Sequence, residues 1–91
     1  MKISRSKQFK KDFRNYIGKM SDKHFESLIE ALNCLKESKQ MPKYFREHEL
    51  SGRLKGYREL HLGGDLLLMY VIKDEVIYLL RMGTHAEILG M

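Results

Sequence analysis

The chain has 91 residues, of which 43% are apolar and 32% are charged, so we expect one small domain over residues 1–91 with a single core. One cysteine excludes an internal disulfide, and the longest apolar run is too short to span a bilayer, so we expect a cytoplasmic protein with no membrane partner. The net charge of +5 gathers in residues 1–23 and 39–58. This distribution favours an anionic partner such as a nucleic acid, and the alternative is a basic helix that is merely solvated.

The first half of the chain predicts a short strand and two amphipathic helices. Ile3 lies in a segment that fits an edge strand. Apolar residues then recur at helical spacing through residues 6–19, and again from residue 21 or 22 to about residue 38. The two helices should form a hairpin, with Cys34 buried as a small hydrophobic residue and His24 exposed in a first turn. The predicted buried stripes are Phe9, Phe13, Tyr16, Ile17 and Met20 in the first helix and Phe25, Leu28, Ile29, Leu32 and Leu35 in the second.

The second half of the chain predicts three strands after a long polar loop over residues 39–53. The strands make an antiparallel meander joined by two short turns, and Thr84 can cap a last helical turn through Leu89. The order β, α, α, β, β, β predicts an α+β fold, in which both helices pack on one face of a small, mainly antiparallel sheet. The predicted strands are residues 54–62, 66–72 and 76–82.

Polar side chains gather in this meander where core strands usually carry apolar residues. Alternation along residues 54–62 sends Lys55, Tyr57, Glu59 and His61 to one face. The meander can bring the ends of its segments together, so the sequence predicts a polar cluster that faces RNA. Taken singly, each histidine also fits an ordinary surface or interior position. The residues that can meet are His48, His61, Asp65, Arg81 and His85.

A longer pattern carries a family resemblance. It consists of His48-Glu49-Leu50-Ser51-Gly52, Lys55-Gly56-Tyr57-Arg58-Glu59-Leu60-His61, Asp65, Leu68-Met69-Tyr70 and Arg81-Met82-Gly83-Thr84-His85. Over nearly its whole length the chain resembles the YafQ branch of the RelE family, which are bacterial endoribonuclease toxins of type II toxin–antitoxin pairs. The resemblance implies a compact helix-plus-sheet toxin that cleaves mRNA on the ribosome and is inhibited by a cognate antitoxin protein. No cofactor is expected.

The resemblance also implies which residues act. The family's functional positions fall on His48, His61, Asp65 and His85. One departure is Leu89, because the family often has an aromatic residue four places after the last histidine. If that aromatic residue stacks on a base, stacking in this chain is weaker or comes from Tyr57, Tyr44 or Phe45.

The chemistry of RNA cleavage requires residues of these types. Without a metal, the reaction needs a base for the 2′-OH proton, cations for the phosphorus oxygens and an acid for the departing 5′-oxygen. We predict His85 as the acid, with Asp65 orienting a histidine, and either His48 or His61 as the base or a phosphate contact. The predicted RNA phosphate contacts are Lys55, Arg58 and Arg81, of which the two arginines would stabilise the phosphorane.

Three alternatives stay open at this level. A metal site built from three histidines and Asp65 is conceivable, but no His-x-x-x-His or Cys-x-x-Cys spacing supports it, so no metal is expected. RelE-like folds also include toxins that inhibit DNA gyrase without cutting RNA, and those would not need three histidines at these positions. A degenerate toxin that only pairs with its antitoxin is the third alternative, and it is compatible with Leu89.

Overall fold

The structure is a computed structural model, and it describes residues 1–90. Each helix begins at a hydroxyl cap, since Ser6, Ser21 and Thr84 each accept a hydrogen bond from the backbone amide three residues later. The elements in chain order are β1 (Lys2–Arg5), α1 (Lys7–Ile17), α2 (Asp22–Lys36), the 3₁₀ turn η1 (Lys43–Phe45), β2 (His48–Glu49), the 3₁₀ turn η2 (Gly52–Leu54), β3 (Arg58–Gly63), β4 (Leu66–Lys73), β5 (Val76–Gly83) and α3 (His85–Leu89). No helix in residues 1–90 combines the length and apolar character needed to cross a membrane.

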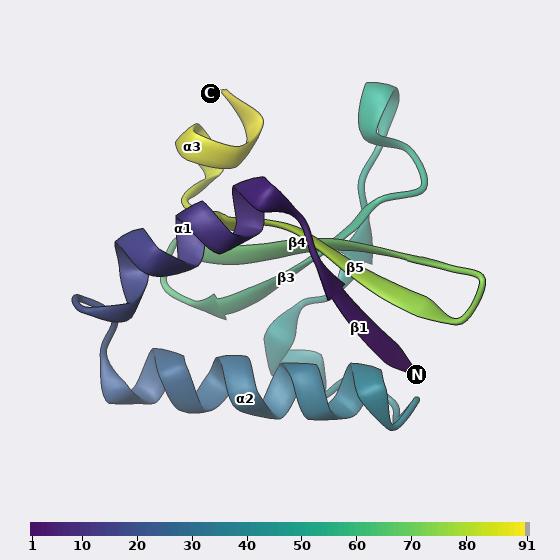
Figure 1. Ribbon diagram of the computed structural model, residues 1–91, viewed down its shortest axis with the longest axis horizontal. Coiled ribbons are helices and arrows are strands. Elements are labelled where there is room, and N and C mark those ends of the chain that lie inside the picture. Colours follow the sequence, from purple (N-terminus) through teal and green to yellow (C-terminus); the bar gives the residue numbers. More distant parts are fainter. Residues whose placement is uncertain (91) are drawn as a thin grey trace.

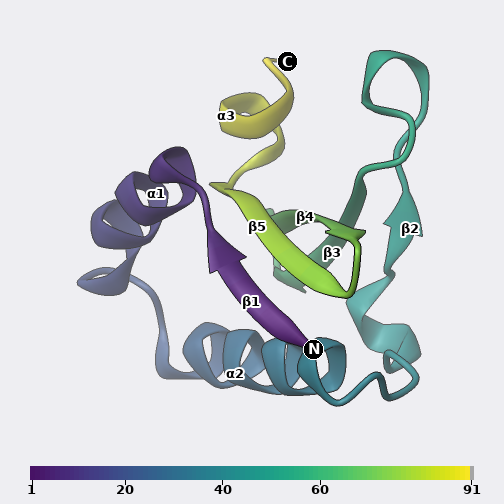
Figure 2. The same cartoon turned by 45° about the vertical axis from the view of Figure 1, so that its right-hand side comes forward.

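The five strands form one sheet in the order β1-β5-β4-β3-β2. Neighbours from β2 to β5 are antiparallel, whereas β1 pairs with β5 in parallel, with Ile3 opposite Ile77. In Figure 1, α2 runs beneath the sheet, and α1 lies beside β5. In both views α3 and the segment that carries η2 rise on the side of the sheet away from α2 (Figure 2). The predicted α+β class, with a mainly antiparallel sheet, is confirmed.

One face of the sheet carries the main hydrophobic core. Side chains from α2 and from alternate positions of β3, β4 and β5 pack together there, and η1 adds the buried ring of Phe45. As the apolar run predicts, β4 is buried on both faces from Leu66 to Tyr70. Cys34 is buried, which confirms its prediction as a small core residue. The fully buried large side chains are Tyr70, Phe45, Leu60, Leu67, Leu68, Ile77, Leu79 and Met82.

The start of the third strand differs from the prediction. The strand β3 begins at Arg58, whereas residues 52–57 form a 3₁₀ turn and a further turn in which Gly56 has a φ of 97°. Lys55 and Tyr57 therefore lie on an exposed projecting segment and not on the face of the strand. The predicted long loop also contains β2, a two-residue strand that pairs His48 with Glu59. Alternation alone could not reveal the change, because the turn continues the same polar pattern into the strand.

Three apolar residues predicted to be buried are exposed. Ile17 of α1 and both Phe25 and Ile29 of α2 stand in solvent, with exposed fractions of 45%, 39% and 53%. The prediction that His24 is exposed is also wrong. Its ring is half-buried because it lies over the backbone of Gly63, where a Cβ atom would come within 2.5 Å of His24 Cδ2.

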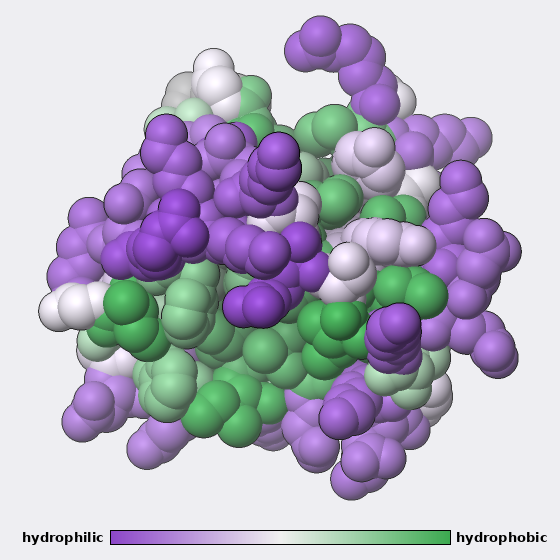
Figure 3. Space-filling view, viewed as in Figure 1, coloured by the Kyte–Doolittle hydropathy of each residue, from purple (hydrophilic) through white to green (hydrophobic). Residues whose placement is uncertain are grey.

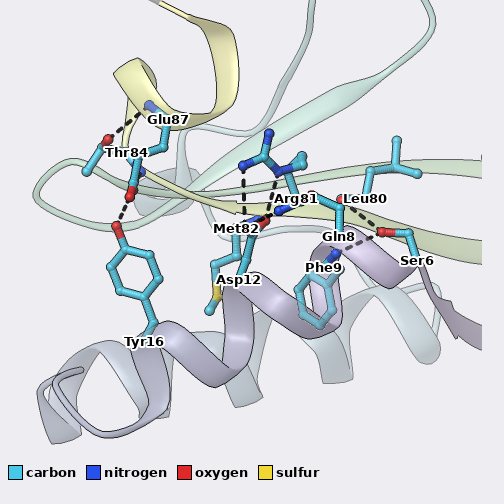
Figure 4. A network of polar contacts seen from close by, with 10 residues as sticks. All are labelled: Ser6, Gln8, Phe9, Asp12, Tyr16, Leu80, Arg81, Met82, Thr84 and Glu87. Atoms are coloured by element: carbon cyan, nitrogen blue, oxygen red, sulfur yellow. Dashed lines mark hydrogen bonds and ion pairs between the residues drawn. The ribbon is translucent and has the colours of Figure 1, made fainter.

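A buried carboxylate ties α1 to the sheet. Asp12 accepts hydrogen bonds from Arg81 Nε at 2.8 Å, from the Met82 amide at 3.0 Å and from Gln8 Nε2 at 3.0 Å (Figure 4). Burial alone would raise the pKa of Asp12, but these hydrogen bonds and the charge of Arg81 outweigh it and hold the pKa below its usual value. The β1 strand pairs with β5 only as far as Leu79, so Asp12 supplies the acceptor that the next part of the edge lacks.

Candidate active site

Three histidines from distant parts of the chain lie in a row on the sheet face away from α2. His48 comes from β2, His61 from β3, and His85 from the first position of α3. The ring centroids of His48 and His61 are 6.0 Å apart, and those of His61 and His85 are 5.9 Å apart. Alternation in β3 gives His61 this direction, because its neighbours Leu60 and Leu62 point into the core. The structure therefore brings together the three histidines that the sequence identifies.

A buried glutamate joins this row and has no role in the sequence prediction. Glu59 Oε1 lies 3.3 Å from His48 Nε2 and 3.8 Å from His85 Nε2, and the Glu59 side chain is only 3% exposed. Its second oxygen, Oε2, is buried without a hydrogen-bond partner in residues 1–90. A buried carboxylate without full hydrogen bonding is costly unless a positive charge lies beside it. The two imidazoles are the polar groups that lie beside this buried carboxylate.

Asp65 holds His85 from the other side. His85 Nδ1 donates to Asp65 Oδ1 at 2.6 Å, and the His85 amide lies 3.4 Å from the same oxygen. The hydrogen bond from His85, more than its charge, keeps the pKa of Asp65 below its ordinary value. With Nδ1 engaged by a carboxylate, Nε2 is the ring nitrogen of His85 that is free to exchange a proton.

The other two histidines differ in their surroundings. His48 Nδ1 lies 2.9 Å from the Arg46 carbonyl oxygen, so it donates there and leaves Nε2 toward Glu59. Burial lowers the pKa of His61, and the charge of Arg46 lowers it further, against a smaller opposing effect of Glu59. His61 is therefore held in its neutral form near pH 7, which is the form that can accept a proton.

The position of His85 depends on the junction between β5 and α3. Thr84 and Glu87 form a reciprocal capping box, and the Tyr16 hydroxyl of α1 donates to Glu87 (Figure 4). Burial and the Glu87 carboxylate raise the pKa of Tyr16 to about 12, so this phenol remains a donor. Gly83 leaves room for Glu87, because a Cβ atom there would lie 2.8 Å from Glu87 Oε1. These contacts fix the first turn of α3 over the end of the sheet.

The predicted phosphate-binding arginines do not join the cluster. Arg58 points to the opposite face of the sheet, where it forms a two-point ion pair with Glu47 at 3.0 and 3.2 Å, and the Tyr70 hydroxyl also donates to Glu47. Arg81 is engaged by Asp12. Lys55 is exposed on the projecting segment and forms no ion pair in residues 1–90. The sequence did not reveal these two ion pairs, because Asp12 lies 69 residues from Arg81 and Glu47 lies 11 residues from Arg58.

A cation that the sequence did not single out lies near the cluster, and an exposed aromatic ring lies on the projecting segment. Arg46 precedes His48 by two residues, forms no ion pair within the described chain and acts on the charge state of His61. Phe45 is only 1% exposed, so it cannot stack on a base. The Tyr44 ring is exposed, but its hydroxyl ties it to Glu30 of α2. Tyr57 is exposed on the projecting segment and has no such tie to α2.

The same side chains include a set that fits a metal ion. Glu59, His61 and His85 each offer one ligand atom, and these atoms lie within 4.8 Å of one another. The set differs from the three histidines and Asp65 considered from the sequence, because it contains Glu59 and neither His48 nor Asp65. An ion bound there would occupy the nitrogens needed for proton transfer.

The positions of Glu59 beside the histidines and of Arg46 near His61 emerge from the structure. Glu59 and Arg46 are ordinary charged residues in the sequence, and only the alternation that places Glu59 beside His61 hints at its location.

Comparison with known proteins identifies relatives of the whole chain. Residues 1–90 match the family model described as a bacterial toxin of type II toxin–antitoxin system, YafQ. The mRNA interferase toxin YafQ of Escherichia coli strain B is 30% identical over 89 residues, which cover 97% of this chain and 95% of that protein. A relative from Haemophilus influenzae is 35% identical over 92 residues, which cover 96% of this chain and 90% of that relative.

Solved structures of toxins from this family superimpose on the chain over nearly its whole length. The crystal structure of YafQ from Escherichia coli strain BL21(DE3) superimposes with a TM-score of 0.86 at 29% identity, covering 97% of each chain. The toxin in the Escherichia coli DinJ-YafQ complex gives 0.83 at 30% identity, again covering 97% of each chain. A copper-bound mutant toxin from Helicobacter pylori gives 0.88 at 33% identity, covering 97% of this chain and 98% of that one.

Proposed function

The chain belongs to the family of bacterial YafQ toxins of type II toxin–antitoxin systems, and from this premise we propose that it is a ribosome-associated endoribonuclease that cuts mRNA. The Escherichia coli relative is an mRNA interferase. The observation that carries the proposal is the row of three histidines bracketed by Glu59 and Asp65. Such a row provides both a proton acceptor and a proton donor within the width of one phosphodiester.

In the proposed reaction His61 is the general base. Its neutral form takes the proton from the 2′-OH, and the 2′-oxygen then attacks the adjacent phosphorus. The lowered pKa of His61 supports this assignment, because an imidazolium could not accept the proton. His48 is the alternative base, and otherwise it contacts the phosphate through Nε2.

His85 is the proposed general acid. Asp65 holds Nδ1, so Nε2 delivers its proton to the 5′-oxygen as the P–O5′ bond breaks. The two centroids of His61 and His85 lie 5.9 Å apart, which suits an acid and a base on opposite sides of one phosphorus. The products are a 2′,3′-cyclic phosphate and a 5′-hydroxyl, and the proton gained by His61 balances the one lost by His85.

Positive charge for the phosphorane would come from Arg46 and from the imidazolium that His61 becomes when it takes the 2′-OH proton. We place Lys55 of the projecting segment along the RNA backbone, since its ammonium is exposed and positively charged. Arg58 and Arg81 are assigned structural roles, because each is already neutralised by a carboxylate. Tyr57 is the proposed stacking residue in place of the aromatic ring that Leu89 lacks.

The proposed partners are mRNA on the ribosome and an inhibitory antitoxin. A YafQ toxin of Escherichia coli forms a complex with DinJ. By the same family relation we propose that this chain is neutralised by a small protein encoded beside it. The net charge of +5 favours an acidic binding segment in that protein.

The deciding experiment is cleavage of a message on programmed ribosomes by purified wild-type protein and by His85→Ala. General acids typically contribute 10²- to 10⁴-fold, so the variant should be slower by about that factor. The His85 side chain is 41% exposed, so the melting temperature should change little. A matched control is His24→Gln, which alters a histidine that contacts Gly63 and lies outside the row. Wild-type rates for purified His85→Ala would refute the assignment of the acid.

The product ends test the mechanism independently of the rate. Cleavage by side chains alone leaves a 2′,3′-cyclic phosphate or 3′-phosphate, and a chelator should not change the ends. A 3′-hydroxyl product would refute this mechanism. Intact message combined with retained toxicity would instead favour a toxin that does not cut RNA.

A further inference from the structure

We propose that the sheet face with the histidine row continues into a stacking platform for the message, where the Tyr78 ring holds one unpaired base and Lys2 and Lys73 hold the phosphates beside it. This inference rests on the RNA cleavage proposed above and adds a contact for the message away from the bond that is cut. The platform is distinct from Tyr57, which lies on the projecting segment before β3 and not in the sheet.

Tyr78 shares a face of the sheet with the histidine row. Leu68 of β4 packs in the core, so alternation points Leu67 and Val71 to the opposite face. Leu67 is paired with His61 of β3. Val71 is paired with Tyr78 of β5. Because paired residues of neighbouring strands point to the same side, the rings of His61 and Tyr78 lie on one face.

The distance between the two rows suits a message that crosses the sheet. Leu67 and Val71 are four residues apart in β4, which is about 13 Å along the strand. Both α3 and the projecting segment rise on this side of the sheet (Figure 2). Hydrophobic atoms are exposed between these two elements in the space-filling view (Figure 3). A few nucleotides of single-stranded RNA can therefore connect the histidine row to the platform.

The ring of Tyr78 is free to take a base. Tyr78 is 37% exposed and stacks on no other aromatic ring within residues 1–90. Three of the five tyrosines instead use their hydroxyls within the fold, each donating to a glutamate: Tyr16, Tyr44 and Tyr70. Pairing with Ser4 and Val71 fixes the backbone of Tyr78 on both sides. Sheets that bind single-stranded RNA stack unpaired bases on rings held in this way.

Two lysines flank Tyr78 on the same face. Lys2 of β1 and Lys73 of β4 are both paired with Val76. Val76 is two residues before Tyr78 in β5, so all of these side chains point to the same side. Both lysines are exposed, and neither forms an ion pair within residues 1–90. An exposed ring with cations beside it matches a base with its flanking phosphates.

Two other occupants fit less well. The buried centre of a protein interface is usually depleted in charged residues, whereas two lysines lie beside this ring. A second copy of this chain in a two-fold contact would bring Lys2 and Lys73 against the same lysines of the other copy, and these like charges would repel. Single-stranded RNA uses both the ring and the cations.

The test measures kcat and KM for cleavage of a message on programmed ribosomes by wild-type protein and by Tyr78→Ala. A contact that holds substrate and transition state equally changes KM and leaves kcat unchanged. Loss of base stacking should raise KM at least about fivefold, whereas Tyr78→Phe keeps the ring and should keep the wild-type KM. The matched control is Ile72→Ala, which removes an exposed apolar side chain from the opposite face of β4 and should leave KM unchanged. The melting temperatures of Tyr78→Ala and Ile72→Ala should be similar, because both side chains are exposed.

A charge change tests the lysines. The double variant Lys2→Gln with Lys73→Gln should raise KM and make it less dependent on salt than in the wild type. The control is Lys23→Gln on α2, which changes an exposed lysine in the helix beneath the other face and should leave both quantities unchanged. Wild-type KM and salt dependence in the double variant would overturn the assignment of the lysines.

Messages that lack a single base identify what the ring contacts. Removal of the base at one position near the cut should raise KM for the wild-type protein, and Tyr78→Ala should not respond to that removal. Equal KM for wild type and Tyr78→Ala would overturn the inference while leaving the proposed cleavage intact. A raised KM without any such position would assign the ring to the ribosome and would also overturn the inference. A wild-type protein that cleaves no message would refute the proposed function, and the inference with it.

Discussion

Replacing Asp12 by asparagine tests how α1 is held to the strand that leads to His85. The substitution keeps the shape of the side chain but removes its charge and turns one acceptor into a donor. In the native protein both oxygens accept, since Asp12 is bonded to Arg81, to the Met82 amide and to Gln8. An asparagine can satisfy only part of this set, because its amide nitrogen must face another donor.

The expected loss follows from these contacts. A hydrogen bond to a charged group contributes about 1.5–3 kcal/mol, and the lower end applies here because the Arg81 side chain is 26% exposed and can reach water. Leaving one buried donor unpaired adds about 1 kcal/mol, so the free energy of unfolding should fall by about 2.5 kcal/mol. For a domain of this size, that loss corresponds to a melting temperature lower by about 10–20 °C.

Thermal unfolding followed by circular dichroism measures this difference, with Asp74→Asn in an exposed turn as the control. Because the folded-state pKa of Asp12 is lowered, its contribution is fully present above the unfolded pKa of about 3.9. The contribution is lost as the pH falls through the lower folded value. The gap between wild type and variant should thus be constant from pH 7 to pH 5 and shrink below about pH 4. A gap under about 3 °C at neutral pH, or one that persists unchanged in acid, would refute the reasoning.

Three further predictions follow from the site. Glu59→Gln should lower mRNA cleavage at least about tenfold at an almost unchanged melting temperature, because it removes the carboxylate that lies against Nε2 of both His48 and His85. Cleavage at the wild-type rate would exclude that role. Arg46→Ala should raise the pKa of His61 toward its ordinary value, since it removes a positive charge that lowers this pKa. An NMR titration of the His61 ring protons measures the shift, and an unchanged pKa would show that Arg46 does not act on His61. Gly63→Ala should lower the free energy of unfolding by about 1–3 kcal/mol, because Gly63 has a φ of 148° and the new methyl group would meet the His24 ring. In a denaturation series, the double variant with His24→Ala should recover part of this loss. Equal stability of all three proteins would contradict the contact.

Local patterns in the sequence predict most of the fold. Helical periodicity and the serine and threonine caps place α1, α2 and α3, and the turns at Gly64-Asp65 and Asp74-Glu75 delimit β4 on both sides. These features depend on backbone geometry within a few residues, so a single chain displays them directly. The residues His48, His61, Asp65 and His85 could be identified because a family resemblance marks them, and alternation correctly places His61 away from the core.

Only the tertiary structure decides which charged groups remain available for function. Arg81 and Arg58 look equivalent to other cations in the sequence, yet carboxylates 69 and 11 residues away bind them. Glu59 acquires its place between two histidines only when β2 pairs with β3 and α3 folds over the end of β5. Periodicity likewise shows that one side of α2 is apolar, but it does not show whether this chain or a partner covers that side. The physical reason is that a side chain's partner, burial and charge state depend on contacts between distant segments, which no local pattern records.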